Sequence, residues 1–291
     1  MRHTRLKGDV LLLTTAAIWG SGFVAQRIGA DFVGPLLFNG LRFGLGAVII
    51  LFFVMRRGKR LNGRVWRMAA LPGTFLFLAG VLQQAGIAYT TAGNAGFITG
   101  LYVVIIPLIL VFLGKRLRAH VWIAVFLAAA GLYLVSIGDD FHLNRGDLYE
   151  LAGAFFWAGH VLVIARYVNR LTVLELAAGQ FFIATLLNLA GAVLFEPLEY
   201  NAVEQALPAI LYTGIFSIAV GFTLQVWGQK YTPPTDTAII MSLEAVFALL
   251  FGYWLLNEHL GGRQIWGMSL MFGAMILAQW DPFALIKTRR S

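Results

Sequence analysis

Hydrophobic residues fall in long runs along the chain, and short segments rich in charged residues separate one run from the next. A bilayer core about 30 Å thick is crossed by a helix of about 20 apolar residues, and each run approaches that length. The pattern therefore predicts an all-α membrane protein with ten transmembrane helices. We place these helices at residues 9–28, 34–55, 68–89, 94–114, 120–138, 147–167, 173–195, 206–229, 235–256 and 264–281.

Proline positions add detail to this pattern. Pro107 lies inside the run at 94–114, so we expect it to kink or break that helix. The other prolines considered fall near predicted helix starts, where a missing backbone N–H costs little. They are Pro35, Pro72, Pro208, Pro233 and Pro234.

Composition indicates that lipid is the solvent. Of the 291 residues, 59% are hydrophobic and 12% are charged, whereas a soluble domain carries about 25% charged residues. Ten spans use most of the chain, so we expect short connections and no extramembrane domain. Cysteine is absent, which excludes disulfides, thiol catalysis and cysteine-ligated metals. The sequence has no glycine-rich phosphate loop between a strand and a helix, and we predict neither a cofactor nor a metal site.

Basic residues are distributed unevenly between the two sides of the membrane. With the N-terminus placed in the cytoplasm, 18 of the 22 Lys and Arg fall in cytoplasmic segments, three fall outside, and Arg42 lies within the second span. By the positive-inside rule, both termini are predicted to be cytoplasmic. The net charge of +8 reflects this clustering, so it does not indicate nucleic-acid binding. The first apolar run extends to about Ile28, so we expect a retained helix rather than a signal peptide.

The two halves of the chain share a sequence register. The first span matches the sixth at an offset of 138, and spans three to five match spans eight to ten at an offset of 142. We therefore predict two five-helix repeats, residues 1–138 and 139–291. The matched positions are Gly8-Asp9 with Gly146-Asp147, Trp19 with Trp157, Gln83 with Gln225, Tyr89-Thr90 with Tyr231-Thr232, Asn94 with Asp236, Tyr102 with Glu244, and Gly131 with Gly273.

Each predicted repeat has an odd number of spans, so the second repeat must enter the membrane from the opposite side. The predicted fold is therefore ten transmembrane helices arranged as two inverted five-helix repeats. Inverted repeats place a pseudo-two-fold axis in the membrane plane, and substrate sites then lie near the midplane between the halves. Rocking of the halves about such a site gives alternating access, which connects this architecture to transport.

Four short segments carry a resemblance to a known family: residues 17–21 (AIWGS), 41–43 (LRF), 92–97 (AGNAGF), and 242–247 (SLEAVF) with Asn257-Glu258. In their order and spacing, the chain resembles the EamA-type permeases of the drug/metabolite transporter superfamily over essentially its whole length. The resemblance implies a carrier of amino acids, sugars or other metabolites, often directed outward. Two positions depart from the family pattern. Lys115-Arg116 replaces a glutamate that commonly ends the fourth span, and Ala245 replaces a frequent proline.

Ionisable side chains at membrane depth are costly, so each is a candidate for function. Glu244, near the middle of the ninth span, either binds an amine-bearing substrate or a coupling proton, or hydrogen bonds a neighbouring helix. His160, in the middle of the sixth span, could titrate near neutral pH or act only in packing. We expect Arg42 to pair with helix carbonyls or an acid rather than with substrate, and Glu258 to be structural.

Several uncharged side chains are predicted at a similar depth. Trp19 and Trp157 lie deeper than an interfacial aromatic belt, and either stack on substrate or fill space between helices. Gln83, Gln225 and Tyr102 could donate hydrogen bonds to a substrate. We predict a substrate-binding cavity between spans one, three, four, six, eight and nine. Its predicted residues are Trp19, Gln83, Tyr102, Trp157, His160, Gln225 and Glu244.

These features predict a secondary transporter in the cytoplasmic (inner) membrane that exports amino-acid-like or amine-bearing metabolites by alternating access. Alternatives are a uniporter, a drug exporter of another solute class, or a channel or receptor. A membrane-embedded enzyme would need a nucleophile, base or metal ligands at motif spacing, which the sequence lacks, so we predict no enzymatic activity. Predicted partners are a small-molecule substrate, membrane lipid and a coupling proton, with the chain a monomer or homodimer. We hypothesise that substrate and proton compete for Glu244, with His160 able to hold that proton if it lies close.

Overall fold

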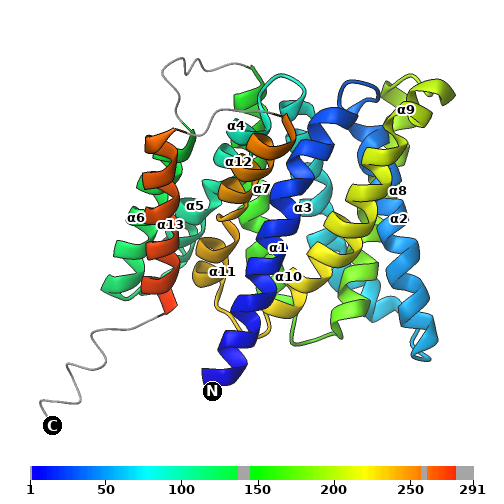
Figure 1. Cartoon of the computed structure of the whole chain (residues 1–291). Helices are drawn as coiled ribbons and strands as arrows, with labels where there is room; N and C mark the ends of the chain where they lie inside the picture. The colour runs from blue at the N-terminus through cyan, green and yellow to red at the C-terminus, as the bar shows by residue number, and fades with distance from the viewer. Residues whose placement is uncertain (1, 137–144, 257–260, 280–291) are drawn as a thin grey trace, which may run out of the picture.

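The computed structural model describes residues 2–136, 145–256 and 261–279, and within these ranges the chain is helical with no β-strand. Eight helical segments are long and apolar enough to cross a membrane, and two further apolar helices are shorter. Together they form the predicted ten-span all-α membrane fold (Figure 1). The elements are α1 (Arg2–Gly29), α2 (Pro35–Arg56), α3 (Gly63–Ile87), α4 (Ala92–Gly100), α5 (Tyr102–Phe112), α6 (Ala119–Ser136), α7 (Arg145–Tyr167), α8 (Val173–Phe195), α9 (Tyr200–Tyr212), η1 (Thr213–Phe222), α10 (Thr223–Gly228), α11 (Pro234–Met241), α12 (Glu244–Leu256) and α13 (Gly262–Gln279).

Local polar contacts explain where several helices begin. α8 starts as predicted, after a capping box: Thr172 Oγ1 accepts from the Glu175 N–H at 3.3 Å, and Glu175 Oε2 accepts from the Thr172 N–H at 3.0 Å. α2 starts with Pro35 in its first turn, and the carboxylate of Glu196 accepts hydrogen bonds from the next two backbone N–H groups at 2.8 and 2.7 Å. An acid at the end of α8 therefore caps a helix 160 residues earlier in the chain.

Three helices begin at least five residues earlier than the hydrophobic pattern predicts. α1 extends back to Arg2 and α9 to Tyr200, because polar residues continue the same helix beyond its apolar run. α3 also begins at Gly63, five residues before the predicted start. As a result, Pro72 and Pro208 lie inside α3 and α9, and their expected placement near helix starts is wrong.

The fourth and ninth spans are each interrupted near the middle. α4 ends at Gly100 and α5 begins at Tyr102, while α11 ends at Met241 and α12 begins at Glu244. The interruptions fall at positions related by the offset of 142 that links the two halves of the sequence. Broken helices at matching places are a recurrent way of building a site at membrane depth.

Pro107 does not cause the interruption of the fourth span, contrary to expectation. It lies within α5, and the break occurs at Leu101. The position that matches Pro107 in the ninth span is Leu249, yet that span is broken as well. At each break a leucine, Leu101 or Leu243, donates its N–H to the carbonyl three residues earlier, at 3.1 and 3.2 Å. This tight turn interrupts both spans without proline.

The eighth span combines α9, η1 and α10 into one helical segment, and η1 is a ten-residue π-helix. Side chains from α1 donate to the wider backbone of this segment. Trp19 Nε1 donates to the carbonyl of Ser217 at 3.1 Å, and Thr15 Oγ1 donates to that of Gly221 at 3.3 Å. π-Helical turns are frequent at functional sites, and η1 is one of the segments that surround the central cavity.

The two halves cross in opposite senses. Gly86, near the end of α3, lies against Gly146, at the start of α7, while Gly159 further along α7 lies against Phe75 earlier in α3. α3 and α7 are therefore antiparallel neighbours. α1 and α3 run in the same direction because α2 returns the chain between them (Figure 1). α7 consequently starts the second half in the direction opposite to α1, as inverted repeats require.

The same close backbone approach occurs once on each side of the molecule. A Cβ atom at Gly86 would lie 2.8 Å from the carbonyl oxygen of Gly146, and one at Gly8 would lie 3.0 Å from that of Gly228. The offsets of 142 and 138 convert the first pair into the second. Glycine is needed at these crossings because it allows two helix backbones to pack together.

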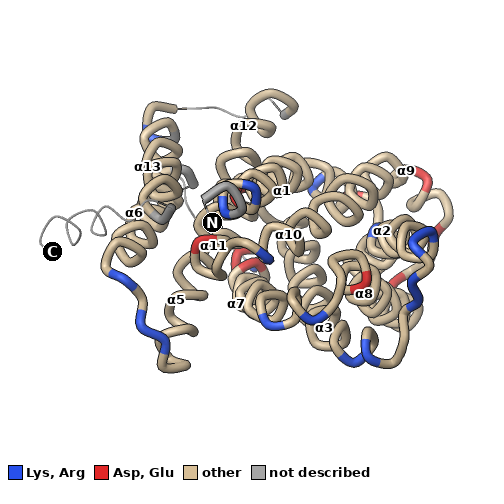
Figure 2. Tube along the Cα trace, turned by 90° about the horizontal axis from the view of Figure 1, so that it is seen from below, with Lys and Arg blue, Asp and Glu red and all other residues tan. Residues whose placement is uncertain are grey.

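Paired helices flank the centre of the fold. α2 packs on α8, and α6 packs on α13, with the remaining spans between these pairs (Figures 1 and 2). Seen from the side that carries the N-terminus, Lys and Arg mark the connections and helix ends (Figure 2). This distribution is the one used to predict the topology from the sequence. The expected structural role of Glu258 falls outside the described residues, as do the chain's last residues, 280–291.

Candidate functional site: a central polar and aromatic cavity

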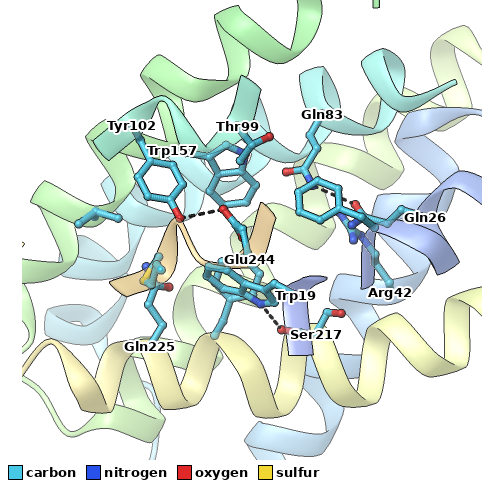
Figure 3. A pocket seen from close by; sticks show the side chains of 14 residues that line it. Trp19, Gln26, Arg42, Gln83, Thr99, Tyr102, Trp157, Ser217, Gln225 and Glu244 are labelled. Carbon is cyan, nitrogen blue, oxygen red and sulfur yellow. Dashed lines mark hydrogen bonds between the residues drawn. The ribbon is translucent and has the colours of Figure 1, made fainter. Parts of the chain in front are cut away.

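A cavity lies at the centre of the molecule, beside the two interrupted spans (Figure 3). Its walls come from spans one, two, three, four, six, eight and nine. Span two was not among the expected contributors. The lining residues are Trp19, Phe23, Gln26, Arg42, Gln83, Thr99, Tyr102, Trp157, Val161, Ser217, Phe222, Gln225, Met241 and Glu244.

Tyr102 and Glu244 occupy the first helical position after the break in their respective spans. The Tyr102 hydroxyl donates to Glu244 Oε1 at 2.7 Å, and both residues are buried (Figure 3). The two breaks therefore bring an acid and a hydroxyl donor together at one place.

Aromatic rings form a second wall of the cavity. The centroids of Trp19 and Trp157 lie 6.4 Å apart, and both rings contact Phe222, with centroids at 4.5 and 5.7 Å. Trp157 stacks on Phe222 at an interplanar angle of 22°. The Trp19 indole N–H is bound to Ser217, whereas that of Trp157 is buried without a partner among the described residues. Such a surface suits the apolar part of a solute and can also attract a cation through its ring faces.

The two glutamines matched by the repeat register both line this cavity. Gln83 Nε2 donates to Gln26 Oε1 at the long distance of 3.5 Å. Gln225 is 1% exposed, and neither its amide oxygen nor its amide nitrogen has a hydrogen-bond partner within the described residues. Buried polar atoms are normally paired, and an unpaired one requires an explanation such as bound water or ligand. Gln225 therefore presents both a donor and an acceptor to this region.

The structure brings together six of the seven residues predicted from the sequence. Their role in substrate binding remains a prediction. The six are Trp19, Gln83, Tyr102, Trp157, Gln225 and Glu244.

His160 is not among the lining residues. Its Nε2 lies 2.8 Å from Gln180 Oε1 on α8, and its ring packs edge-on against Trp157 with centroids 6.0 Å apart. One turn of α7 separates the two residues, and the helical rotation directs His160 toward α8 while Trp157 faces the cavity. His160 therefore lies behind the cavity wall, against the lining residues Trp157 and Phe222.

Four polar lining residues were absent from the predicted set. Gln26, Thr99 and Ser217 resemble ordinary polar positions of membrane helices and give no distinctive sequence signal. Arg42 did give a signal, because a guanidinium within a predicted span is rare. The expected partner of Arg42 was wrong: its Nε donates to Asn39 Oδ1 at 2.7 Å, and no ion pair with an acid occurs within the described residues.

A second acid lies just beyond the cavity. Glu150 on α7 is fully buried, and its Oε2 accepts a hydrogen bond from Thr99 Oγ1 at 3.1 Å. Its other carboxylate oxygen has no partner within the described part of the chain. Thr99 itself lines the cavity, so it connects Glu150 to the space occupied by Glu244 and Tyr102. Glu150 lies on the same helix as His160 and is not among the residues predicted from the sequence.

Equivalent hydrogen bonds occur on the two opposite faces of the molecule. Thr90 Oγ1 donates to Asp147 Oδ1 at 2.8 Å, and Thr232 Oγ1 donates to Asp9 Oδ1 at 3.1 Å. These pairs are related by the same two sequence offsets that define the predicted repeats. In each case the start of one half is bound to the end of the third span of the other half.

Cation–aromatic contacts accompany these hydrogen bonds. The Arg145 guanidinium lies 3.6 Å from the ring centroid of Tyr89, and Lys7 Nζ lies 6.0 Å from that of Tyr231. Lys7 also lies 4.6 Å from the Trp227 ring. The face that carries the N-terminus has an additional ion pair between Arg5 and Asp236. Position 94, which matches Asp236, is an asparagine and cannot form an equivalent ion pair.

The described residues include no group of three His, Asp or Glu placed to hold a metal ion.

The sequence profile of the EamA-like transporter family matches the chain in two stretches, residues 6–137 and 144–280. An uncharacterized transporter of Archaeoglobus fulgidus is 34% identical over 274 residues, covering 94% of this chain and 86% of the relative. A protein of Escherichia coli strain K12 named as a probable amino-acid metabolite efflux pump is 28% identical over 292 residues, covering 93% and 94%.

A solved crystal structure superposes on 93% of this chain and 96% of its own, with a TM-score of 0.77 and 20% sequence identity. At that identity, the likeness supports the fold alone. The family profile and the 34% identical relative both extend over most of the chain, so they concern the whole molecule rather than one segment.

Proposed function

Because this chain belongs to the EamA-like transporter family, we propose that it is a secondary transporter that exports amine-bearing or amino-acid-like metabolites by alternating access. Family membership makes it a multi-pass membrane protein with a small-molecule substrate. The finer statement of substrate, direction and coupling is our proposal. The observation that carries it is Glu244, a buried acid facing a central cavity beside aromatic rings.

The chemistry of the cavity favours an amine on the substrate. Glu244 can accept hydrogen bonds from an ammonium group. The Tyr102 hydroxyl orients this carboxylate by donating to Oε1 at 2.7 Å. The faces of Trp19 and Trp157 attract cations as well as apolar groups. The name of the relative from Escherichia coli, a probable amino-acid metabolite efflux pump, agrees with this substrate class and with outward transport.

Competition between substrate and proton at Glu244 would couple their movements. An ionised carboxylate at membrane depth is costly unless a partner or water compensates its charge. Tyr102 supplies one hydrogen bond, and either a proton or a substrate ammonium supplies the missing positive charge. Arrival of one therefore favours departure of the other. His160 does not line the cavity that holds Glu244, and its Nε2 is engaged by Gln180, so our proposal assigns the coupling proton to Glu244 alone.

Alternating access requires contacts on the two faces that form and break in turn. The hydrogen bond between Thr90 and Asp147, and its counterpart between Thr232 and Asp9, are suited to this role. Each links the start of one half to the other half, on opposite faces. We propose that opening the cavity toward a face separates the pair on that face while the other pair stays closed.

The remaining predictions from the sequence form part of this proposal. The repeats are residues 1–138 and 139–291, and the chain is a monomer or homodimer in the cytoplasmic membrane. We place both termini in the cytoplasm, because 18 of the 22 Lys and Arg fall in the segments predicted on that side of the membrane. Lys and Arg mark connections on the face that carries the N-terminus (Figure 2). Export then proceeds away from this face.

Transport into liposomes containing only the purified protein tests the proposal. We expect at least one amine-bearing metabolite to move faster than in protein-free liposomes, and an imposed pH gradient to change the rate. Movement unaffected by the gradient would leave a uniporter and contradict proton coupling. If only solutes without an amine move, the assigned substrate class is wrong.

A further inference from the structure

Arg42 on α2 is a buried cation that lines the same cavity as Glu244 (Figure 3). Its exposed fraction is 3%, comparable with the 2% of Glu244. A charged side chain at this depth is expensive, so its retention within a membrane span calls for a specific partner or a function. The contacts of Arg42 show which of its donors are already engaged.

The protein satisfies Arg42 only in part. Its Nε donates to Asn39 Oδ1 at 2.7 Å, and its guanidinium lies 5.4 and 5.2 Å from the ring centroids of Phe38 and Phe43. Within the described residues its two terminal nitrogens have no hydrogen-bond partner, and the ion pairs present there involve other residues. Asn39 and the two rings therefore fix the direction of the guanidinium while leaving its outer edge available.

The outer edge of a guanidinium has a specific chemical preference. Its two terminal N–H groups form a planar fork that matches the two oxygens of a carboxylate. In Figure 3, Arg42 lies at one end of the cavity with Gln26 and Gln83, while Glu244 and Tyr102 lie toward the other. Both glutamines also carry amide donors suited to an oxyanion.

We propose that Arg42 is the anion-binding residue of this cavity, and that the site selects solutes carrying both an amine and a carboxylate. The amine binds at Glu244 and the carboxylate at the Arg42 fork, with the apolar remainder against Trp19 and Trp157. This inference rests on the proposed function as an amine transporter and narrows its substrate class. A zwitterion supplies both missing counter-charges at once, whereas a simple amine leaves Arg42 uncompensated.

Binding to the unmodified protein provides the primary test. The probes are amino acids, including α- and ω-amino acids of increasing charge separation, and the methyl ester of each, which keeps the amine and loses the anion. Thermal shift or calorimetry on purified protein gives the affinities. We expect at least one acid to bind about 10- to 100-fold more tightly than its ester, the range expected for loss of a charged hydrogen bond. Equal binding of every acid and ester would overturn the role of Arg42.

Substitutions then assign the preference to Arg42. Arg42→Gln should reduce the acid's advantage over its ester to less than about threefold, chiefly by weakening binding of the acid, and Arg42→Lys should restore part of that advantage because the charge is kept. Arg27→Gln is the matched control, since Arg27 pairs with Asp31 at the exposed end of α1. If Arg42→Gln retains the full preference, another group binds the carboxylate. Transport of esters but not acids would contradict this inference and leave the proposed amine transporter intact, whereas no transport of either would contradict the proposed function itself.

Discussion

Tyr102 and Glu244 stand 142 residues apart in the sequence and share a hydrogen bond of 2.7 Å at the centre of the molecule. They are matched positions of the two halves, and each follows a break in its transmembrane span. Two symmetry-related positions can touch only near the axis that relates them. The contact therefore places the acid where an inverted-repeat transporter is expected to hold its substrate.

Removing the Tyr102 hydroxyl should weaken the site without dismantling it. In Tyr102→Phe the ring still fills its position, but Glu244 loses its hydrogen-bond donor. We expect a loss of about 1.5–3 kcal/mol in the free energy of unfolding and a roughly tenfold or greater weakening of the apparent substrate affinity, because one hydrogen bond to a charged group is lost. Transport titrations in liposomes measure the affinity. Wild-type affinity in the folded variant would show that the hydroxyl does not orient the acid.

The helix crossing at Gly86 should tolerate no side chain. A Cβ atom there would lie 2.8 Å from both the carbonyl oxygen of Gly146 and Glu150 Cγ. We expect Gly86→Ala to lower the free energy of unfolding by about 1–3 kcal/mol, the usual cost of overpacking. Gly63→Ala is the control, since nothing lies within 4 Å of a Cβ at Gly63. Equal thermal unfolding temperatures for the two variants would contradict this packing.

His160 should matter for folding and not for coupling. Its hydrogen bond with Gln180 is fully buried, so His160→Leu leaves that amide unpaired and should cost about 1–3 kcal/mol of stability. The pH dependence of transport by the folded variant should match wild type, because His160 does not line the cavity. A shift in the pH dependence of transport by His160→Leu would contradict this prediction and show that His160 takes part in proton coupling.

The ion pair between Arg5 and Asp236 should bias the direction in which the cavity opens. Because the matched position on the opposite face is uncharged, Arg5→Gln should favour opening toward the face that carries the N-terminus. The chain lacks cysteine, so Ser217→Cys introduces a single label in the cavity. We expect a water-soluble maleimide added from the N-terminal face to react several-fold faster with Ser217→Cys when Arg5→Gln is also present than when Arg5 is retained.

Arg27→Gln provides the control for this labelling experiment. Arg27 pairs with Asp31 at the end of α1 and does not line the cavity. Its loss should leave the labelling rate from either face unchanged. If Arg5→Gln and Arg27→Gln label at the same rate, the Arg5 ion pair does not control access.

Hydrophobic patterning predicted the spans well because lipid imposes their length. α8 occupies the predicted residues, and the matched positions Tyr102 and Glu244 meet as their register suggests. The breaks at Leu101 and Leu243 were not predictable from the pattern, since both leucines continue an apolar run. Pro107 was a misleading signal for a different reason, because a proline can be accommodated inside a membrane helix.

Side-chain direction was the least predictable feature of the site. Trp157 and His160 lie at similar depth on α7, but only Trp157 lines the cavity. The depth in the membrane that is inferred from the sequence gives no information on which of two nearby helix faces is turned toward the cavity. For Arg42, the sequence favours pairing with helix carbonyls or an acid, and only the structure places it on the cavity without an acidic partner in the described part of the chain.

The charge of Glu244 is the central claim. Glu244→Gln preserves the shape of the side chain and removes its charge, while Glu199→Gln changes an exposed acid at the start of α9 and serves as control. The decisive measurement is the rate of amine-bearing solute transport into liposomes as a function of pH. We predict that Glu244→Gln lowers this rate at least about tenfold and abolishes its pH dependence, since loss of one charged hydrogen bond alone accounts for such a factor. A purified, folded Glu244→Gln variant that transports at the wild-type rate with the wild-type pH dependence would contradict the account.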